Sequence, residues 1–314
     1  MTILVTGAAG FIASNLCHHL ISLGEEVVGI DALKTGSCLD NIDDIGSDKF
    51  CFHVVNLCNY EYLKGVFQGR TFDQVYHLAA ESHVDRSIAG DLPFWESNVI
   101  GTRNLLDCCR EFGVNRILNQ ITDEVYGPKR KGVSFESDVF LPTSPYAASK
   151  AAQYYVGRSY HQTHNLPVVS TFPANTYGPR QYPEKLVPKF IGKLLAGDRV
   201  PLMASVHFQR DWLAVTDHIE ALVHIMKHGV IGEGYNVPGT GCVTNETITR
   251  MLLEYTDRLW ESSVDLIEDR KAHDCRYCVD GHKLATLGWQ PTNKLADYLP
   301  VVVEWYKQNA RSEE

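Results

Sequence analysis

The sequence lacks the features of several classes of protein. No apolar run approaches the roughly 18 residues that a membrane-spanning helix needs. The opening residues MTILVTGAAG have no charged region and no cleavage site of a secretory signal. The net charge of −9 carries no long single-sign run, which argues against a general binder of nucleic acid or of anionic membranes. We therefore expect a cytoplasmic globular protein with no nucleic-acid or membrane partner.

Cysteine pairs with regular spacing are also scarce. Nine cysteines are spread along the chain, and this odd number suits reduced thiols in a cytoplasm. Cys275 and Cys278 have C-x-x-C spacing, but no second pair completes the four ligands of a structural zinc site. We expect no metal, and a redox role for this pair is the less favoured alternative.

The first part of the chain alternates strands with helices. Strands are expected at ILVTG, EVVGID, FCFHVVNL, QVYHLAA, RILNQIT and PVVSTFPANTYG, with helices at Ala13–Leu23 and Ser97–Phe112. Such alternation predicts βαβ units and a parallel sheet, and strands that are apolar on both faces agree with it. The expected fold class is α/β, a doubly wound parallel Rossmann sheet with a smaller C-terminal substrate-binding lobe.

The alternation of strands and helices ends near Pro179. PRQYPEKLVP is rich in proline and polar residues and predicts a loop over a site. Helices are expected at Phe190–Ala196, Asp217–His228, Thr244–Leu259 and Leu295–Gln308. We assign residues 1–178 mainly to a cofactor-binding Rossmann domain and 179–314 mainly to the lobe, with a return segment around 211–240.

A glycine-rich turn follows the first strand. Gly7 and Gly10 permit a tight turn and close approach of the backbone to a pyrophosphate at the positive end of the helix that Phe11 and Ile12 open. Asp31 ends the next strand, 21 residues after Gly10. An acid there can bind both ribose hydroxyls and would repel a 2′-phosphate, so the predicted cofactor is NAD and not NADP.

Two further motifs carry chemistry. Tyr146 and Lys150 are four residues apart on one helix face, where an ammonium favours the phenolate and makes the tyrosine a base. Thr122-Asp123-Glu124 follows a strand and offers an acid and a base that can eliminate water. Oxidation and elimination in one site indicate a sugar dehydratase. The alternatives are a solvated turn for the acids and simple packing for Tyr146.

These residues resemble the extended short-chain dehydrogenase/reductase family, and more closely its dTDP-glucose 4,6-dehydratases. The resemblance covers almost the whole chain, through TGAAGFIASNL, HLAAESHVDRSI, TDEVYG, SPYAASKAA, NTYGPRQYPEKLVPKFI, RDWLAVTDHIEAL, YNVPG and EDRKAHDCRY. The T-D-E triplet discriminates best, since related 4-epimerases usually show T-S-S and decarboxylases T-S-E. Asp123 therefore favours a dehydratase.

The resemblance implies a reaction with named roles. Tyr146, with Lys150, takes the proton of the sugar 4-hydroxyl while hydride passes from C4 to NAD, and Thr122 bonds the 4-oxygen. Glu124 removes the C5 proton and Asp123 protonates the leaving 6-hydroxyl, after which hydride returns to C6. The family also implies a homodimer formed by two helices of each subunit.

The resemblance further implies two sets of binding residues. The cofactor set, besides Gly7, Gly10, Phe11, Ile12, Asp31, Tyr146 and Lys150, is Asn56, Leu57, Leu78, Ala79, Ala80, Ser82, Ser97 and Thr176. The set for the nucleotide-sugar substrate is Ser82, Thr122, Asn175, Lys185, Leu186, Pro201, Met203, Arg210, Asn236, Asp269, Arg270 and His273. Arg210 is the expected diphosphate clamp, because its planar fork suits phosphate oxygens.

The sequence departs from the family pattern near the expected nucleotide base. Met203 takes the position of a usual tyrosine, and Ala204 and Val206 take those of two glycines, while Lys271-Ala272 replaces a common Pro-Gly. The base is therefore open between thymine and uracil. The alternatives to a dTDP-glucose dehydratase are the same reaction on UDP-glucose or another nucleotide hexose, an epimerase or decarboxylase, and a non-catalytic NAD-binding regulator.

Overall fold

A sheet of seven strands forms the centre of the molecule in the computed structural model, which describes residues 1–270 and 273–309. Lys271-Ala272 lies outside the described residues. The strand order is β10-β6-β5-β4-β1-β2-β3, and every neighbouring pair is parallel. The bounds are β1 Thr2–Thr6, β2 Glu26–Asp31, β3 Phe50–Val54, β4 Gln74–His77, β5 Arg116–Gln120, β6 Val168–Pro173 and β10 Gly234–Val237. The expected doubly wound parallel sheet is confirmed.

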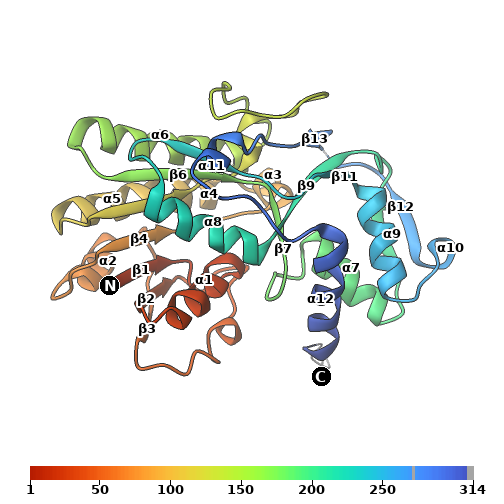
Figure 1. The fold of residues 1–314 in the computed structure, drawn as a ribbon, viewed down its shortest axis with the longest axis horizontal. Helices are drawn as coiled ribbons and strands as arrows, with labels where there is room; N and C mark the ends of the chain where they lie inside the picture. The colour runs from red at the N-terminus through yellow and green to blue at the C-terminus, as the bar shows by residue number, and fades with distance from the viewer. Residues whose placement is uncertain (271–272, 310–314) are drawn as a thin grey trace.

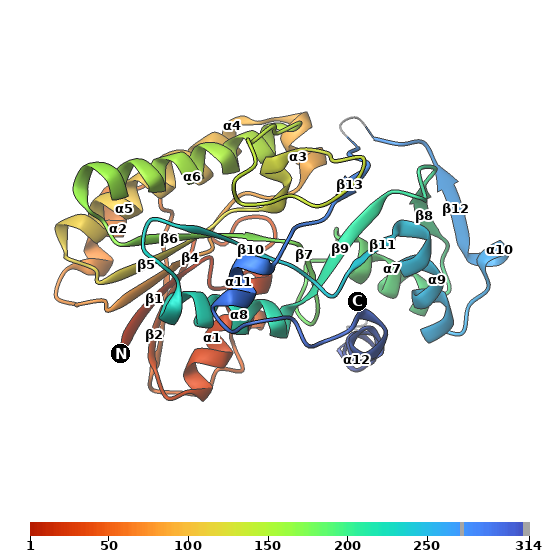
Figure 2. The ribbon, with the colours of Figure 1, turned by 45° about the horizontal axis from the view of Figure 1, so that its top comes forward.

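Helices cover both faces of this sheet (Figures 1 and 2). One layer contains α1 (Phe11–Ser22) and α8 (Val215–His228), and the opposite layer contains α2 (Tyr60–Phe67), α5 (Thr102–Glu111) and α6 (Pro145–His164). Each layer buries its own apolar cluster against the strands. Burial on both faces explains why the strands read as continuous apolar runs.

The longest helix, α6, has clear boundaries in the sequence. The Ser144 hydroxyl accepts a hydrogen bond from the amide of Ala147 at 3.1 Å, and Pro145 occupies the first turn. Asn165 ends the helix in the left-handed conformation at φ 54°. These caps fix where the first turn lies, and Tyr146 belongs to that turn.

Two expected elements are divided. The helix expected at Ser97–Phe112 consists of a π-helical segment, η2 (Glu96–Gly101), followed by α5. The strand expected at PVVSTFPANTYG ends at β6, and β7 (Asn175–Tyr177) pairs with β9 (Gln209–Ala214) of another sheet. Both breaks place residues at the carboxyl end of the main sheet, where π-helical turns and strand switches commonly accompany function.

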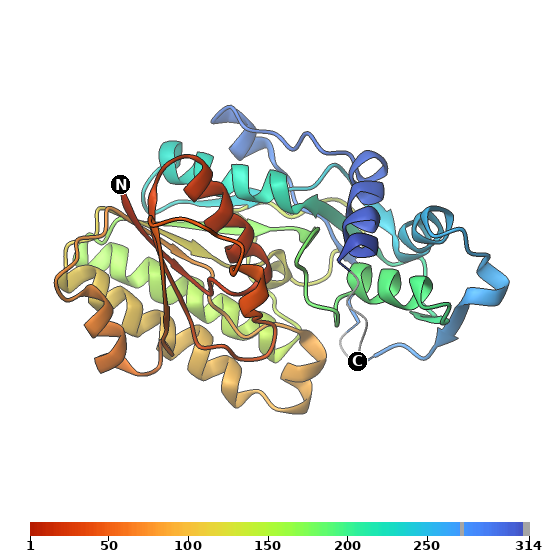
Figure 3. The same ribbon diagram turned by 90° about the horizontal axis from the view of Figure 1, so that it is seen from below.

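The smaller lobe lies at one end of the main sheet (Figure 3). Its helices α7 (Leu186–Leu195), α9 (Asn245–Tyr255) and α12 (Leu295–Gln308) bury a third apolar cluster. β9 joins the lobe to the site, between β11 (Cys242–Thr244) and β13 (Arg276–Tyr277). The other lobe elements are β8 (Val200–Met203), α10 (Trp260–Ser263) and β12 (Val264–Ile267), with α11 (His282–Thr286) beside β10.

The remaining short elements are η1 (Leu39–Asn41), α3 (Val84–Ala89), α4 (Leu92–Trp95) and η3 (Asp123–Tyr126). Among the described residues, no helix has the length and apolar character needed to span a membrane. The expectation of uniformly reduced thiols is wrong, because Cys242 and Cys278 form a disulfide. Sequence spacing could not reveal it, since the partners are 36 residues apart and meet only through the pairing of β11 and β13 with β9.

Candidate active site

A cavity of about 350 Å³ opens at the carboxyl ends of the parallel strands and extends toward the lobe. Its wall includes Gly7 after β1 and Leu78 after β4, which flank the point where the strand order reverses. Ligands of doubly wound sheets bind at this point. The predicted residues in its wall are Gly7, Gly10, Phe11, Ile12, Asp31, Asn56, Leu57, Leu78, Ala79, Ala80, Ser82, Ser97, Thr122, Asp123, Glu124, Tyr146, Lys150, Asn175, Thr176, Lys185 and Leu186.

The glycine turn after β1 brings the backbone of Gly7 close to the backbone that follows β4. Gly7 has φ +74°, and a Cβ there would lie 2.9 Å from the Cα of Ala79. Gly10 caps α1 without a side-chain hydrogen bond, so the amides of the first turn have no side-chain partner at the cap. Phe11 and Ile12 carry such amides in the cavity wall. Free amides at the positive end of a helix fit a pyrophosphate.

Asp31 is held in a fixed orientation at the end of β2. Its Oδ2 accepts a hydrogen bond from the amide of Ala9 at 3.1 Å, and its Oδ1 accepts from Leu33 N at 2.7 Å and Ser37 Oγ at 2.8 Å. The carboxylate lies in the cavity wall and is 5% exposed. This arrangement suits a pair of ribose hydroxyls and opposes an additional phosphate.

Asp123 and Glu124 follow β5 in the turn η3. Burial, then the charges of Glu124 and Asp211, raises the pKa of Asp123 well above its usual range. Burial also raises the pKa of Glu124, but the cations Lys185, Arg270 and Arg210 oppose that rise. Asp123 Oδ2 is buried without a hydrogen-bond partner among the described residues. The surroundings therefore favour the proton on Asp123 over Glu124.

Lys150 makes its hydrogen bonds with residues other than Tyr146, and its activation of Tyr146 stays a prediction. Its ammonium donates to Gln120 O at 2.7 Å and to Gln153 Oε1 at 2.6 Å, and burial lowers its pKa to about 7. Burial, then the carboxylate of Glu124, raises the pKa of Tyr146, although the Thr122 hydroxyl opposes this. Their shared helix face brings Tyr146 and Lys150 into the cavity wall, as predicted. Sequence spacing does not reveal that Gln120 and Gln153 bind the ammonium of Lys150.

Several polar atoms of the cavity wall have no hydrogen-bond partner among the described residues. They include Asn175 Oδ1, Gln181 Oε1 and Trp212 Nε1. Buried polar atoms normally have partners, so these atoms are suited to bind a ligand. Gln181 and Trp212 were not among the predicted site residues, although both belong to the quoted motifs PRQYPEK and RDW.

Six predicted substrate residues lie outside the cavity wall but in the lobe beside it, namely Pro201, Met203, Arg210, Asp269, Arg270 and His273. Asp269 accepts a hydrogen bond from Ser205 N at 3.0 Å and pairs with His273 at 3.3 Å. Arg270 pairs with Asp85 of α3 at 3.4 Å, which links the lobe to the Rossmann domain. Arg210 and Arg270 both act on the charge of Glu124, so these two arginines lie near the acid pair.

Asn236 differs from the other predicted substrate residues, because it lies neither in the cavity wall nor in the lobe beside it. It is fully buried in β10, where its Oδ1 accepts from Tyr126 OH at 2.8 Å and its Nδ2 donates to Ser134 O at 2.9 Å. The YNVPG motif thus supplies a structural amide where a substrate contact was expected. No group of His, Cys, Asp and Glu among the described residues could hold a metal ion.

Comparison with known proteins agrees with this arrangement. The model of the GDP-mannose 4,6 dehydratase family matches residues 4–300. A dTDP-glucose 4,6-dehydratase of Actinoplanes sp. is 40% identical over 98% of both chains, and one of Streptomyces griseus is 40% identical over 98% of this chain and 94% of that protein. DesIV, a dTDP-glucose 4,6-dehydratase of Streptomyces venezuelae solved with NAD bound, has TM-score 0.95, 39% identity and 98% coverage of both chains.

Proposed function

Because this chain belongs to the dTDP-glucose 4,6-dehydratase family, we propose that it converts dTDP-glucose to dTDP-4-keto-6-deoxyglucose and water. It is an NAD-dependent hydro-lyase. The glycine turn, Asp31 and the unpartnered polar atoms of the cavity fit NAD, which supplies a hydride acceptor for sugar C4 and a hydride donor for C6.

The observation that carries this proposal is the different charge environment of two adjacent buried acids. Elimination of water needs one group that donates a proton and one that accepts a proton. Burial, then neighbouring carboxylates, raises the pKa of Asp123 well above its usual range. Burial also raises the pKa of Glu124, but three cations oppose that rise. Asp123 is therefore the acid for the 6-oxygen and Glu124 the base for the C5 proton.

Tyr146 is the proposed base for the sugar 4-hydroxyl. Thr122 is proposed to orient that hydroxyl by a hydrogen bond to the 4-oxygen. Burial, then the charge of Glu124, raises the pKa of Tyr146, and the Thr122 hydroxyl opposes part of that rise. Positive charge must therefore approach the phenol for it to ionise near neutral pH. Lys150 can supply that charge if its ammonium turns from Gln153 toward Tyr146 once the cavity is filled.

The direct test is a product assay with three substrates: dTDP-glucose, UDP-glucose and UDP-N-acetylglucosamine. Each is incubated with the purified protein, with and without added NAD, and mass spectrometry records loss of one water. Loss of water from dTDP-glucose alone would support the proposal. Turnover only of a UDP-sugar would keep the mechanism and change the substrate, and no dehydration of any of them would refute the roles of Asp123 and Glu124.

The alternative with structural support is the same reaction on a UDP-sugar. Met203 ends β8 and pairs with Ile267 of β12. Members of the dehydratase family usually carry a tyrosine at the position of Met203. A thioether chain offers no aromatic face for stacking on a base, so this position does not select thymine over uracil.

We also propose a homodimer formed through η2, α5 and α6. Ile100 of η2 is 50% exposed and Tyr155 of α6 is 55% exposed, which leaves apolar surface on these packed helices. On α6, Tyr154 packs on Phe172 and the Tyr160 hydroxyl donates to Asp107, so Tyr155 supplies the exposed aromatic surface. Sedimentation at the mass of one chain would contradict the dimer. The cytoplasmic location stays a prediction.

A further inference from the structure

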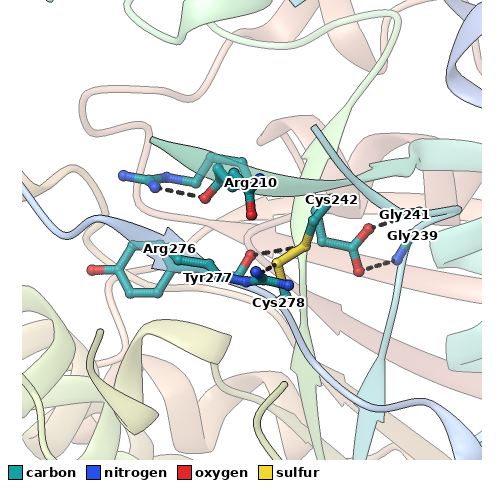
Figure 4. The surroundings of a disulfide bond; sticks show 9 residues. Arg210, Gly239, Gly241, Cys242, Arg276, Tyr277 and Cys278 are labelled. Atoms are coloured by element: carbon teal, nitrogen blue, oxygen red, sulfur yellow. Dashed lines mark hydrogen bonds between the residues drawn. A yellow bond between two sulfur atoms is a disulfide. The ribbon is translucent and has the colours of Figure 1, made fainter. Parts of the chain in front are cut away.

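The Cys242–Cys278 disulfide joins the two strands that flank β9 (Figure 4). Cys242 of β11 lies opposite Asp211 of β9, and Cys278 directly follows β13, whose Tyr277 lies opposite Arg210. The other seven cysteines are free. The bridge therefore fastens the C-terminal end of β13 beside the strand that carries Arg210.

Arg210 depends on the segment that ends at this bridge. Its guanidinium lies 4.7 Å from the centre of the Tyr277 ring, and its Nη2 donates to the carbonyl of Asp274 at 2.8 Å. The Tyr277 hydroxyl donates to the Asp274 carboxylate, which also accepts from Thr143. Arg210 is 7% exposed, so these contacts set the direction of its remaining donors.

The bridge also closes a loop around other residues of the lobe. The 36-residue separation between Cys242 and Cys278 includes Asp269, Arg270 and His273, and Arg270 acts on the charge of Glu124. At the far end of β13, Gln209 N donates to Cys275 O at 3.0 Å. Without the covalent bridge, short β13 would be held beside β9 by few hydrogen bonds and the packing of Tyr277.

We propose that Cys242 and Cys278 are positioning residues, whose disulfide holds Arg210 in the orientation that binds the diphosphate of the nucleotide-sugar substrate. Reduction by a dithiol breaks the S–S bond, and two electrons and two protons pass to the cysteines while the dithiol becomes a cyclic disulfide. An external disulfide reverses the reaction by thiol exchange. Affinity for the substrate then follows the redox state of the bridge.

A small thiol can reach this bridge. Cys242 is partly exposed and contributes to the wall of a second cavity, which also contains Gly239, Gly241, His282 and Trp289. None of the residues in that wall belongs to the wall of the active-site cavity. A reductant can therefore act on the disulfide without occupying the place of NAD or of the sugar.

The first part of the test does not depend on the proposed function. Alkylation of the denatured, unreduced protein should modify seven of the nine cysteines and leave a Cys242–Cys278 linked peptide, whereas prior dithiothreitol should expose all nine. Hydrogen exchange of the native protein should become faster at residues 275–278 after reduction. Nine free thiols without reductant, or unchanged exchange at these residues, would overturn the proposal.

The second part rests on the proposed function and measures affinity apart from turnover. Calorimetry with dTDP and with UDP should show about tenfold weaker binding to the reduced protein, because a charged contact is misaligned. The KM for the turned-over sugar should rise similarly while kcat changes less than about threefold. Equal affinities in both redox states would overturn the role of Arg210. Absence of nucleotide binding in both states would instead refute the proposed function. The hydrogen-exchange experiment would still show whether the disulfide holds residues 275–278 in place.

Variants separate this bridge from general thiol effects. The double variant C242S/C278S should bind nucleotide like the reduced protein and no longer respond to dithiothreitol. C51S is the matched control, because Cys51 is an exposed free cysteine on β3. The control should keep the affinity and the redox response of the unmodified protein. A redox response that persists in the double variant would overturn the assignment to this cysteine pair.

Discussion

At the scale of single residues, the environment assigns different tasks to two carboxyl groups that are adjacent in the chain. Burial and the charges of Glu124 and Asp211 raise the pKa of Asp123 well above its usual range. Burial also raises the pKa of Glu124, but three cations oppose that rise. The T-D-E motif predicts the presence of an acid and a base. The surroundings of Asp123 and Glu124 in the fold determine which carboxyl takes each role.

Replacement of Asp123 tests that division. Asp123→Asn should reduce dehydration by about 10²–10⁴-fold, since an amide cannot give a proton to the leaving oxygen. Oxidation at C4 should persist, so exchange of the C5 proton with deuterated water, read by mass spectrometry, should continue. Turnover of the unmodified enzyme should also fall as pH rises through the raised pKa of Asp123, where the acid form is lost.

Glu124→Gln is the matched control, because it changes the neighbouring acid in the same way. It should abolish deuterium exchange at C5 while C4 oxidation remains. Full turnover by Asp123→Asn, or equal exchange in both variants, would contradict the assigned roles.

Other residue positions show what sequence could and could not predict. Helical spacing correctly brings Tyr146 and Lys150 into one cavity wall. It does not reveal that Gln120 and Gln153 bind the ammonium of Lys150, because Gln120 is distant in sequence and only the packing of β5 on α6 brings it near. The hydrogen bonds of Asn236 were not predictable for a similar reason, since its side-chain partners come from the segment 126–134.

At the scale of elements, the turn between β1 and α1 depends on the absence of a side chain at Gly7. Gly7→Ala should destabilise the protein by about 1–3 kcal/mol and weaken NAD binding, because alanine disfavours the positive φ. Its methyl group would also meet Ala79 at 2.9 Å. Chemical denaturation and fluorescence titration with NAD measure the two effects.

Gly132→Ala separates backbone strain from the clash. Gly132 has φ +80°, but a Cβ there meets no atom within 4 Å. This control should lose about 1 kcal/mol of stability from its strained φ and keep normal affinity for NAD. Unchanged NAD affinity in Gly7→Ala would show that the close approach of β1 and β4 is not needed for the cofactor.

Element boundaries were predictable where side-chain pattern alone decides them. Apolar runs located β1, β2, β4 and β5 because these strands are buried on both faces of a parallel sheet. The division between β6 and β7 was not predictable, since Ala174 continues the apolar run while β7 pairs with β9 of the second sheet. That pairing depends on a strand more than thirty residues later.

At the scale of the whole molecule, the cavity gathers residues from the glycine turn, the acid pair and α7 of the lobe. The alternation of strands and helices predicts this α/β architecture. The β11-β9-β13 arrangement and its disulfide follow from short strands that carry little periodicity in sequence. Ligands in such a cavity should stabilise the entire folded chain, because its wall draws on both parts.

This expectation gives a test of cofactor selectivity. NAD at about 100 times its Kd should raise the free energy of unfolding by about 2.7 kcal/mol, measured by denaturant titration. NADP at the same concentration should stabilise less, since each tenfold loss of affinity removes about 1.4 kcal/mol. The reason is Asp31, whose carboxylate is fixed by Ala9, Leu33 and Ser37 and cannot turn away from a 2′-phosphate.

Asp31→Asn isolates that charge while it preserves the size of the side chain. The variant should reduce the difference in stabilisation between NAD and NADP, because the amide removes the repulsion and one acceptor of the ribose hydroxyls. Equal stabilisation of the unmodified protein by both cofactors would contradict the role of Asp31. An unchanged difference in Asp31→Asn would place the discrimination elsewhere in the cavity wall.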